Sequence, residues 1–146
     1  MSDVYFAVCG YALPEQWRQR WSDPRIKWLG FVPDLTVEQQ ASAVFLAALR
    51  EGGLQPKVLE ALAAGLPLVS TSQGVSGLAL TKEVEYACAD TTDGLAEALI
   101  QVLNQPKASR RMGEAGRNYA VRHHDRSAVA QQLEDVYRKM VDAHWN

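Results

Sequence analysis

The chain has 146 residues, the length of one ordinary domain with a substantial core. Apolar residues make up 47% and charged residues 22%, and the net charge of −2 excludes a basic surface for nucleic acid or anionic membrane. No apolar run is long enough to span a bilayer, and the N-terminus lacks a signal-peptide layout. We therefore expect a cytoplasmic protein, with peripheral membrane association through a partner left open.

Short apolar runs alternate with helical patterns along the chain. Strands are expected at Val4–Cys9, Ile26–Phe31, Val44–Leu49, Leu68–Thr71 and Val84–Ala89. Helices are expected to begin at Pro14 and to span Leu35–Ala43, Lys57–Ala64, Asp93–Asn104, Ser109–Arg122 and Ser127–Ala143. This alternation predicts an α/β fold with a doubly wound parallel sheet, Rossmann-like, with helices on both faces and a helical C-terminal tail.

Several side chains are expected to be structural. Trp17 and Trp21 lie one helical turn apart, and core packing is favoured over a ligand platform. Cys9 and Cys88 form no motif, so we expect buried free thiols and no disulfide or metal site. The stretch 123–125 (HHD) is expected to form a turn between two helices.

The last helix carries an apolar stripe at helical spacing, which needs a surface to cover. The stripe consists of Val129, Leu133, Val136, Tyr137 and Met140.

The stretch Leu49–Leu80 organises the rest of the chain. A strand leads into a turn at Gly52–Gly53, and Pro56 opens a short helix that stops at Gly65. Glycines let the backbone come close to a ligand, and the free N–H groups at a helix start favour an anion. The stretch therefore predicts an anion site, with an ordinary strand-to-helix connection as the alternative.

Charged side chains surround the same helix start. Arg50 and Lys57 add mobile cations, and Glu60 lies one turn beyond Lys57 on nearly the same face. A carboxylate is suited to accept hydrogen bonds from sugar hydroxyls. The residues alone therefore indicate a site for a phosphorylated, hydroxyl-rich ligand, most simply a nucleotide-sugar.

This stretch resembles the nucleotide-sugar-binding loop of group 1 retaining glycosyltransferases with the two-domain GT-B architecture. The family's motifs stand here, in order, as Gly52-Gly53-Leu54, Leu59-Glu60-Ala61, Ala64-Gly65, Pro67-Leu68-Val69-Ser70-Thr71 and Gly74. Leu49-Arg50 and the spacing of Lys57 and Glu60 fit one subgroup of that family. The resemblance extends from about Phe6 to Tyr137 and includes the helical segment RRMGEAGRNYA.

The resemblance implies roles for individual residues. Glu60 would bind the ribose hydroxyls, and the backbone of Gly30, Phe31 and Val32 would contact the base. The remaining donor-binding positions, centred on the diphosphate, would be Arg50, Gly52, Gly53, Leu54, Lys57 and Gly74.

Glu51, Lys57 and Glu60 are the candidate catalytic residues. The family's first glutamate, which touches the donor sugar, falls at Gly52 here, with Glu51 one position upstream. Two readings of Glu51 stay open: it contacts the sugar from a re-spaced turn, or it is an exposed surface side chain.

The resemblance also implies that part of the enzyme lies outside these residues. We expect residues 1–146 to form the donor-binding domain, beginning at its second strand, without the first βα unit and the N-terminal acceptor-binding domain. In many members of the family, that missing βα unit supplies an Arg and a Lys to the diphosphate. With the central strand absent, Val4–Cys9 is expected to pair directly with Val44–Leu49, or else to borrow a strand from another chain.

The implied reaction is transfer of a sugar, of hexosyltransferase type, from a nucleotide-diphosphate sugar to a hydroxyl acceptor with retention. No metal is expected, because Arg50, Lys57 and the helix start neutralise the leaving diphosphate. The isolated chain is expected to be inactive. Two alternatives stay open: a non-catalytic nucleotide-sugar-binding module that acts with a partner chain, and a sugar-nucleotide epimerase-like protein.

Overall fold

A computed structural model describes residues 4–145, with side chains through residue 143. The chain divides between Glu38 and Gln39 into two compact units, and each unit is described by itself. Whether residues 1–146 act as one donor-binding domain stays a prediction.

The first unit is a strand, a helix and a second strand. β1 (Phe6–Cys9) and β2 (Ile26–Gly30) pair in parallel, and α1 (Glu15–Arg20) connects them. α2 (Leu35–Gln40) spans the division between the units. Within residues 4–38 no side chain is fully buried, so these strands are held mainly by their ladder.

The expected core role of the two tryptophans is wrong. Trp17 and Trp21 are 42% and 46% exposed, and their ring centroids lie 6.1 Å apart. The rings therefore pack on each other, and the Arg20 guanidinium lies 5.5 Å from the centroid of the Trp21 ring. The physical reason is that α1 has only six residues and no buried face of its own.

The second unit holds a three-stranded parallel sheet in the order β3-β4-β5. β3 (Phe45–Ala47) and β5 (Ala87–Cys88) flank β4 (Leu68–Ser70). All three residues of the central strand are buried. This is the pattern of a strand covered on both faces, as the run of apolar residues predicts.

The helices of the second unit follow the strands in sequence. They are α3 (Pro56–Ala63), the 3₁₀ turn η1 (Gln73–Val75), α4 (Thr92–Asn104), α5 (Pro106–His124) and α6 (Arg126–Trp145). Thr91 caps α4, since its hydroxyl accepts a hydrogen bond from the Gly94 N–H at 3.1 Å.

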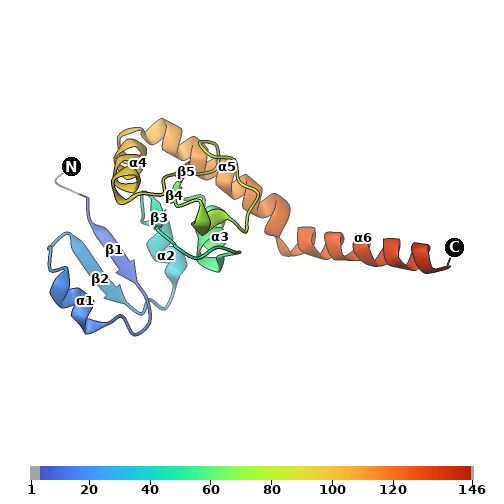
Figure 1. The fold of residues 1–146 in the computed structure, drawn as a ribbon, viewed down its shortest axis with the longest axis horizontal. Helices are drawn as coiled ribbons and strands as arrows, with labels where there is room; N and C mark the ends of the chain where they lie inside the picture. Colours follow the sequence, from blue (N-terminus) through green and yellow to red (C-terminus); the bar gives the residue numbers. More distant parts are fainter. Residues whose placement is uncertain (1–3, 146) are drawn as a thin grey trace. The chain divides into compact units, whose positions relative to one another are not determined.

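Two successive residues of β4 belong to two separate hydrophobic clusters. Leu68 belongs to a cluster with Val58 and Leu62 of α3 and Ala120 of α5. Val69 belongs to a second cluster with Val102 of α4. Helices therefore cover both faces of the sheet (Figure 1). This confirms the predicted doubly wound, Rossmann-like α/β fold with a helical C-terminal segment.

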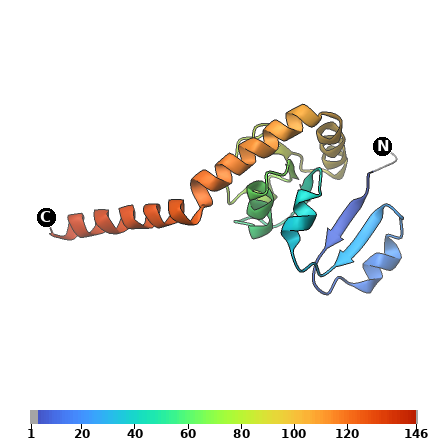
Figure 2. The same ribbon diagram turned by 180° about the vertical axis from the view of Figure 1, so that it is seen from behind.

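Glycines set the close approach of α3 and α5, which lie side by side (Figure 2). A side chain at Gly113 would collide with the carbonyl oxygen of Gly65, the residue with φ +76° just after α3. A side chain at Gly116 would come within 2.7 Å of the Leu62 Cδ2 atom. The Arg117 guanidinium donates a hydrogen bond to the Ala63 carbonyl at the same crossing. The glycines inside α5 are therefore required by packing.

The expected pairing of Val4–Cys9 with Val44–Leu49 is wrong. Among the described residues β1 forms its ladder with β2 alone, and β3 pairs with β4 in a separate sheet. Each sheet draws its hydrogen bonds from strands of its own unit. A strand borrowed from another chain stays a prediction.

The expected strand over Val84–Ala89 is shorter than predicted. Only Ala87–Cys88 pair with β4, because the preceding residues form a turn in which the N–H groups of Val84 and Glu85 both donate to the Thr81 carbonyl. Glu83 has φ +62°, which ends any extended run there.

The last two helices meet at a single residue. Helix α5 runs through His124, and the break falls at Asp125, whose carboxylate accepts a hydrogen bond from the Ser127 N–H at 2.9 Å. The turn predicted at 123–125 is therefore confined to its last residue. Figure 1 shows α6, in red, running away from the strands of the second unit.

Within the described residues, no side chain covers the apolar stripe of α6. The exposed fractions of Val129, Leu133, Val136, Tyr137 and Met140 lie between 47% and 62%. None of the helices described has the length and apolar content needed to cross a membrane.

Candidate functional site

The candidate site lies where two adjacent parallel strands end. β3 ends at Ala47 and β4 at Ser70, so the segments that follow both strands leave the same edge of the sheet. The buried Ser70 hydroxyl hydrogen-bonds to the Ala47 carbonyl at 3.1 Å and to the Thr71 carbonyl at 3.0 Å. Ligands of open α/β sheets bind at this edge, so the sequence-predicted turn is in the expected place.

A second hydroxyl ties the two segments together further along. The Thr71 hydroxyl donates to the Leu49 carbonyl at 2.6 Å and accepts from the Gly74 N–H at 3.1 Å. Gly74 is buried, and a side chain there would come within 2.5 Å of the Ser70 Oγ atom. Its N–H is thus used inside the loop, and its predicted part in donor binding stays a prediction.

The Gly-rich turn is exposed along its whole length. Arg50, Glu51, Gly52, Gly53 and Leu54 all face solvent. Gly53 has φ +100°, a conformation that favours glycine, and the place where its side chain would lie is empty. A ligand can therefore approach the turn closely. The exposure of Glu51 fits both readings left open for it.

The start of α3 follows directly. Pro56 is the first helical residue and has no N–H, so Lys57 carries the first N–H of the helix. The N–H groups of Val58 and Leu59 donate to the Gln55 carbonyl, at 3.0 and 3.2 Å. Gln55 provides no side-chain cap, which leaves the helix end open to an external anion.

The two faces of α3 divide apolar from charged residues. Val58, Ala61 and Leu62 are buried, whereas Lys57 and Glu60 are exposed. Glu60 therefore does not point into the core, the placement that would have ruled out a role at the ribose. The structure brings Lys57, Glu60 and the turn together on one short segment.

The three residues predicted to contact the base lie in the first unit. Gly30 is the last residue of β2 and has φ +68°, Phe31 is 70% exposed, and Val32 is half-buried. Their role at a nucleotide base stays a prediction.

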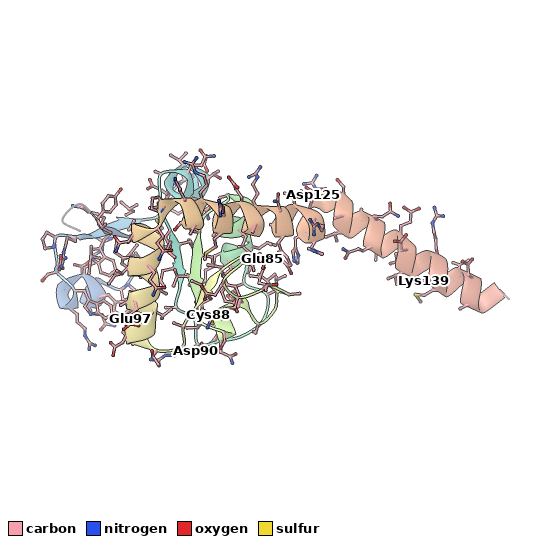
Figure 3. All side chains as sticks on the ribbon, turned by 90° about the horizontal axis from the view of Figure 1, so that it is seen from above. Glu85, Cys88, Asp90, Glu97, Asp125 and Lys139 are labelled. Atoms are coloured by element: carbon pink, nitrogen blue, oxygen red, sulfur yellow. The ribbon has the colours of Figure 1, made fainter. Side chains whose placement is uncertain are left out.

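Sequence reasoning missed Asp90 and the loop beside it. One carboxylate oxygen of Asp90 accepts hydrogen bonds from the Ser72 N–H at 2.7 Å and from the Ser72 hydroxyl at 2.9 Å. These two bonds lower the pKa of Asp90 below its ordinary value. Figure 3 labels Cys88 and Asp90 where the chain leaves β5 and enters α4. Asp90 thus holds the segment that follows β4.

Loop residues Ser76 and Gly77 were also missed. The Ser76 hydroxyl accepts a hydrogen bond from the Gly53 N–H at 3.0 Å, and Gly77 packs against the peptide between Gly53 and Leu54. The signal available in the sequence is the run of small polar residues, TSQGVSG, that directly follows a buried strand.

The other polar groups form no second centre. Among the described residues, no three of the His, Cys, Asp or Glu side chains come together as metal ligands would. Cys9 and Cys88 are free and half-buried, and burial raises the pKa of the Cys9 thiol. A groove along α6 and a hollow of about 460 Å³ between α4 and α5 are both lined by residues other than the predicted site residues.

A comparison with known families decides what the chain is related to. Residues 1–105 match the family described as glycosyl transferases group 1. The chain belongs to the group 1 glycosyltransferases. This confirms the resemblance that the motifs around Gly52 and Glu60 carry.

Solved structures share the fold of this group 1 glycosyltransferase chain. Sucrose-phosphate synthase from Thermosynechococcus elongatus superimposes with a TM-score of 0.78 at 22% identity, over 94% of this chain and 38% of that one. Anabaena HepE in complex with UDP superimposes with a TM-score of 0.78 at 17% identity, over 93% of this chain and 41% of that one. WaaG, a glycosyltransferase involved in lipopolysaccharide biosynthesis, superimposes with a TM-score of 0.75 at 18% identity, over 92% of this chain and 38% of that one.

The fold is thus that of the GT-B glycosyltransferases, and the chain spans about two fifths of the length of these structures. None of the curated proteins matches the sequence.

Proposed function

We propose that this chain is the donor-binding half of a retaining glycosyltransferase of hexosyltransferase type. A nucleotide-diphosphate sugar lies at the sheet edge, its diphosphate against the turn at Arg50–Leu54 and the start of α3. The Glu60 carboxylate accepts hydrogen bonds from its ribose hydroxyls. The sugar passes to a hydroxyl acceptor held by another part of the enzyme.

One observation carries this proposal. An open helix start with Lys57 as its first N–H donor follows an exposed glycine turn, and Lys57 and Glu60 share the exposed face of the same helix. The N–H and the ammonium group suit a diphosphate, while the carboxylate suits hydroxyls. A single short segment thus provides complementary groups for both parts of a nucleotide-sugar.

In the proposed reaction, the bond between the anomeric carbon and the diphosphate oxygen breaks while the acceptor oxygen forms a new bond to the same carbon on the same face. The electron pair of the broken bond leaves with the diphosphate. Arg50, Lys57 and the helix start stabilise this charge without a metal ion. The proton of the acceptor hydroxyl leaves with the nucleoside diphosphate or with a base outside this chain.

The chain spans 38% to 42% of the related structures, which favours an acceptor-binding part elsewhere and an isolated chain that binds without transferring. A non-catalytic nucleotide-sugar-binding module that acts with a partner chain is the second candidate, favoured by the same observation. We also propose a cytoplasmic location for the site.

Calorimetric titration of the chain with UDP-glucose, GDP-mannose and ADP-glucose tests the binding proposal. Anabaena HepE has been solved with UDP-glucose, which makes the uracil donor the first to test. We expect one of the three nucleotide sugars to bind, and its affinity should be the same with and without EDTA. Absence of binding by all three would contradict the proposal. A transfer assay with the supplied acceptor half, with the product anomer assigned by NMR, separates retaining transfer from binding alone.

A further inference from the structure

We propose that Ser76 and Gly77 are positioning residues that hold the diphosphate-binding turn in its shape, an inference that rests on the proposed function. Neither residue is expected to touch the ligand. Both act through Gly52, Gly53 and Leu54.

The first part of the argument is the hydroxyl of Ser76. It accepts a hydrogen bond from the Gly53 N–H at 3.0 Å and donates one to the Gln73 carbonyl at 3.0 Å. The hydroxyl therefore bridges the turn after β3 and the loop after β4, which are 23 residues apart in sequence. It also takes up the N–H of Gly53, so that group is directed at the loop.

The second part is steric. A side chain at Gly77 would collide with the backbone nitrogen of Leu54 and the carbonyl carbon of Gly53, and it would come within 2.7 Å of the Leu54 Cα atom. These are backbone atoms, so the turn itself would have to shift. A side chain at Gly52 would come within 2.7 Å of the Ser76 Oγ atom. Two glycines and one small hydroxyl thus fit the two segments directly against each other.

The third part is the support behind the loop. Thr71 and Ser72 fix its beginning, through hydrogen bonds to the Leu49 carbonyl at 2.6 Å and to the Asp90 carboxylate at 2.7 and 2.9 Å. Ser76 therefore holds Gly53 from a loop that is itself fixed to the segments that follow β3 and β5. Gly53 has φ +100°, and no atom lies within 4 Å of the place where its side chain would be. The turn is therefore held by the Ser76 hydrogen bond to Gly53 and by the packing of Gly77 against Gly53 and Leu54, which together we call the clamp.

The consequence concerns the anion site. The turn leads through Gln55 into Pro56, so its shape sets where the backbone of the turn lies relative to the first free N–H of α3 and the Lys57 ammonium group. Diphosphate binding needs these donors converged on one place, and a shift of about 1 Å is enough to weaken such a site strongly. Loss of the clamp should therefore weaken diphosphate binding and leave nucleoside binding unchanged.

The test uses Ser76→Ala in the 146-residue chain, with Ser72→Ala as the matched control. Ser72 is in the same loop, and its variant also loses a hydroxyl hydrogen bond, in this case to Asp90. The Ser72 N–H keeps its own bond to the Asp90 carboxylate, so the loop stays attached there. Hydrogen exchange of the Gly53 amide is first measured by NMR without ligand. We expect exchange roughly 2- to 12-fold faster in Ser76→Ala, the value of one neutral hydrogen bond. Ser72→Ala should leave it unchanged, and Ser76→Thr, which keeps the hydroxyl, should restore it.

The same variants are then titrated with UDP, inorganic pyrophosphate and uridine. Ser76→Ala should weaken UDP and pyrophosphate by roughly 2- to 12-fold and leave uridine unchanged. Equal losses for UDP and uridine, or faster Gly53 exchange with unchanged UDP affinity, would overturn the positioning role. Unchanged exchange in Ser76→Ala would overturn the clamp itself.

The two proposals fail in different ways. If the unmodified chain binds neither UDP nor pyrophosphate, the proposed function and the positioning role both fail, while faster Gly53 exchange in Ser76→Ala still establishes the contact. Gly77→Ala should abolish pyrophosphate binding with the chain still folded by circular dichroism. Full pyrophosphate affinity in folded Gly77→Ala would contradict the steric part.

Discussion

The two parallel sheets of this chain differ in how they are stabilised. In the second unit, Leu68 and Val69 of β4 are completely buried between helices on opposite faces of the sheet. In the first unit, Phe6 of β1 is 51% exposed and Leu29 of β2 is 40% exposed. The candidate site follows β3 and β4, so it rests on the part of the chain with the larger buried core. The turn proposed to bind the diphosphate is thus attached to the sheet with the larger buried core.

The largest expected effect comes from replacing one leucine in each sheet by alanine and comparing the two losses of stability. Leu68→Ala should lower the free energy of unfolding by about 2–5 kcal/mol, because it removes a completely buried side chain. Leu29→Ala should lower it by less than about 1 kcal/mol, because Leu29 is 40% exposed. Urea unfolding of both variants measures the difference. Equal losses would break the comparison.

A smaller effect is expected at the crossing of α3 and α5. Gly113→Ala should lower the free energy of unfolding by about 1–3 kcal/mol, because its methyl group would collide with the Gly65 carbonyl. An alanine inside an exposed helix would instead stabilise by up to about 1 kcal/mol. Gly10→Ala is the control in the first unit, since its nearest neighbour is the flexible end of Leu13. A stabilised Gly113→Ala would show that the crossing is looser than described.

The cap of α4 should contribute less again. Thr91→Ala removes the acceptor for the Gly94 N–H and should lower the free energy of unfolding by about 0.5–2 kcal/mol. Thr92→Ala, the next residue and already helical, serves as the control and should change stability less. Chemical unfolding monitored by circular dichroism gives both values. A larger loss in Thr92→Ala would contradict the assignment of the cap.

The smallest effect is electrostatic and lies in the first unit. Hydrogen bonds from the Arg25 side chain, with an additional bond from the Arg25 N–H, lower the pKa of Asp23 from 3.8 to about 2. Because the folded pKa is the lower one, the stabilisation is present above about pH 4 and is lost as the pH falls toward 2. The group is fully exposed, so the effect on stability is small. NMR titration should give a pKa near 2, rising toward 3.8 in Arg25→Ala.

Much of the fold could be predicted from the sequence because local patterns determine it. Buried apolar runs mark β3 and β4, Pro56 and Gly65 mark the ends of α3, and the helix predicted at Asp93–Asn104 corresponds to α4. Strand ends were less predictable, since Val84 lies in a turn that the apolar run does not reveal. The pairing of β1 was mispredicted because partner choice depends on contacts between distant segments.

The candidate site was predictable in its composition and less so in its support. The glycines, Lys57 and Glu60 stand out as a local pattern on one turn and helix. Ser76 and Asp90 act across 23 and 18 residues of sequence, and only the folded chain brings them to their partners. The glycines of α5 likewise have a role only once α3 lies against them.

The central claim, a diphosphate site at the turn and the start of α3, is tested most directly by comparing UDP with uridine in Lys57→Ala. Calorimetry is run on this variant and on Lys107→Ala, which removes the same charge from the exposed first turn of α5. The account predicts that Lys57→Ala weakens UDP binding by roughly 1–3 kcal/mol, the value of a charge-assisted hydrogen bond. Uridine binding by Lys57→Ala and UDP binding by Lys107→Ala should both be unchanged. Equal losses for UDP and uridine, or unchanged UDP binding in Lys57→Ala, would contradict it.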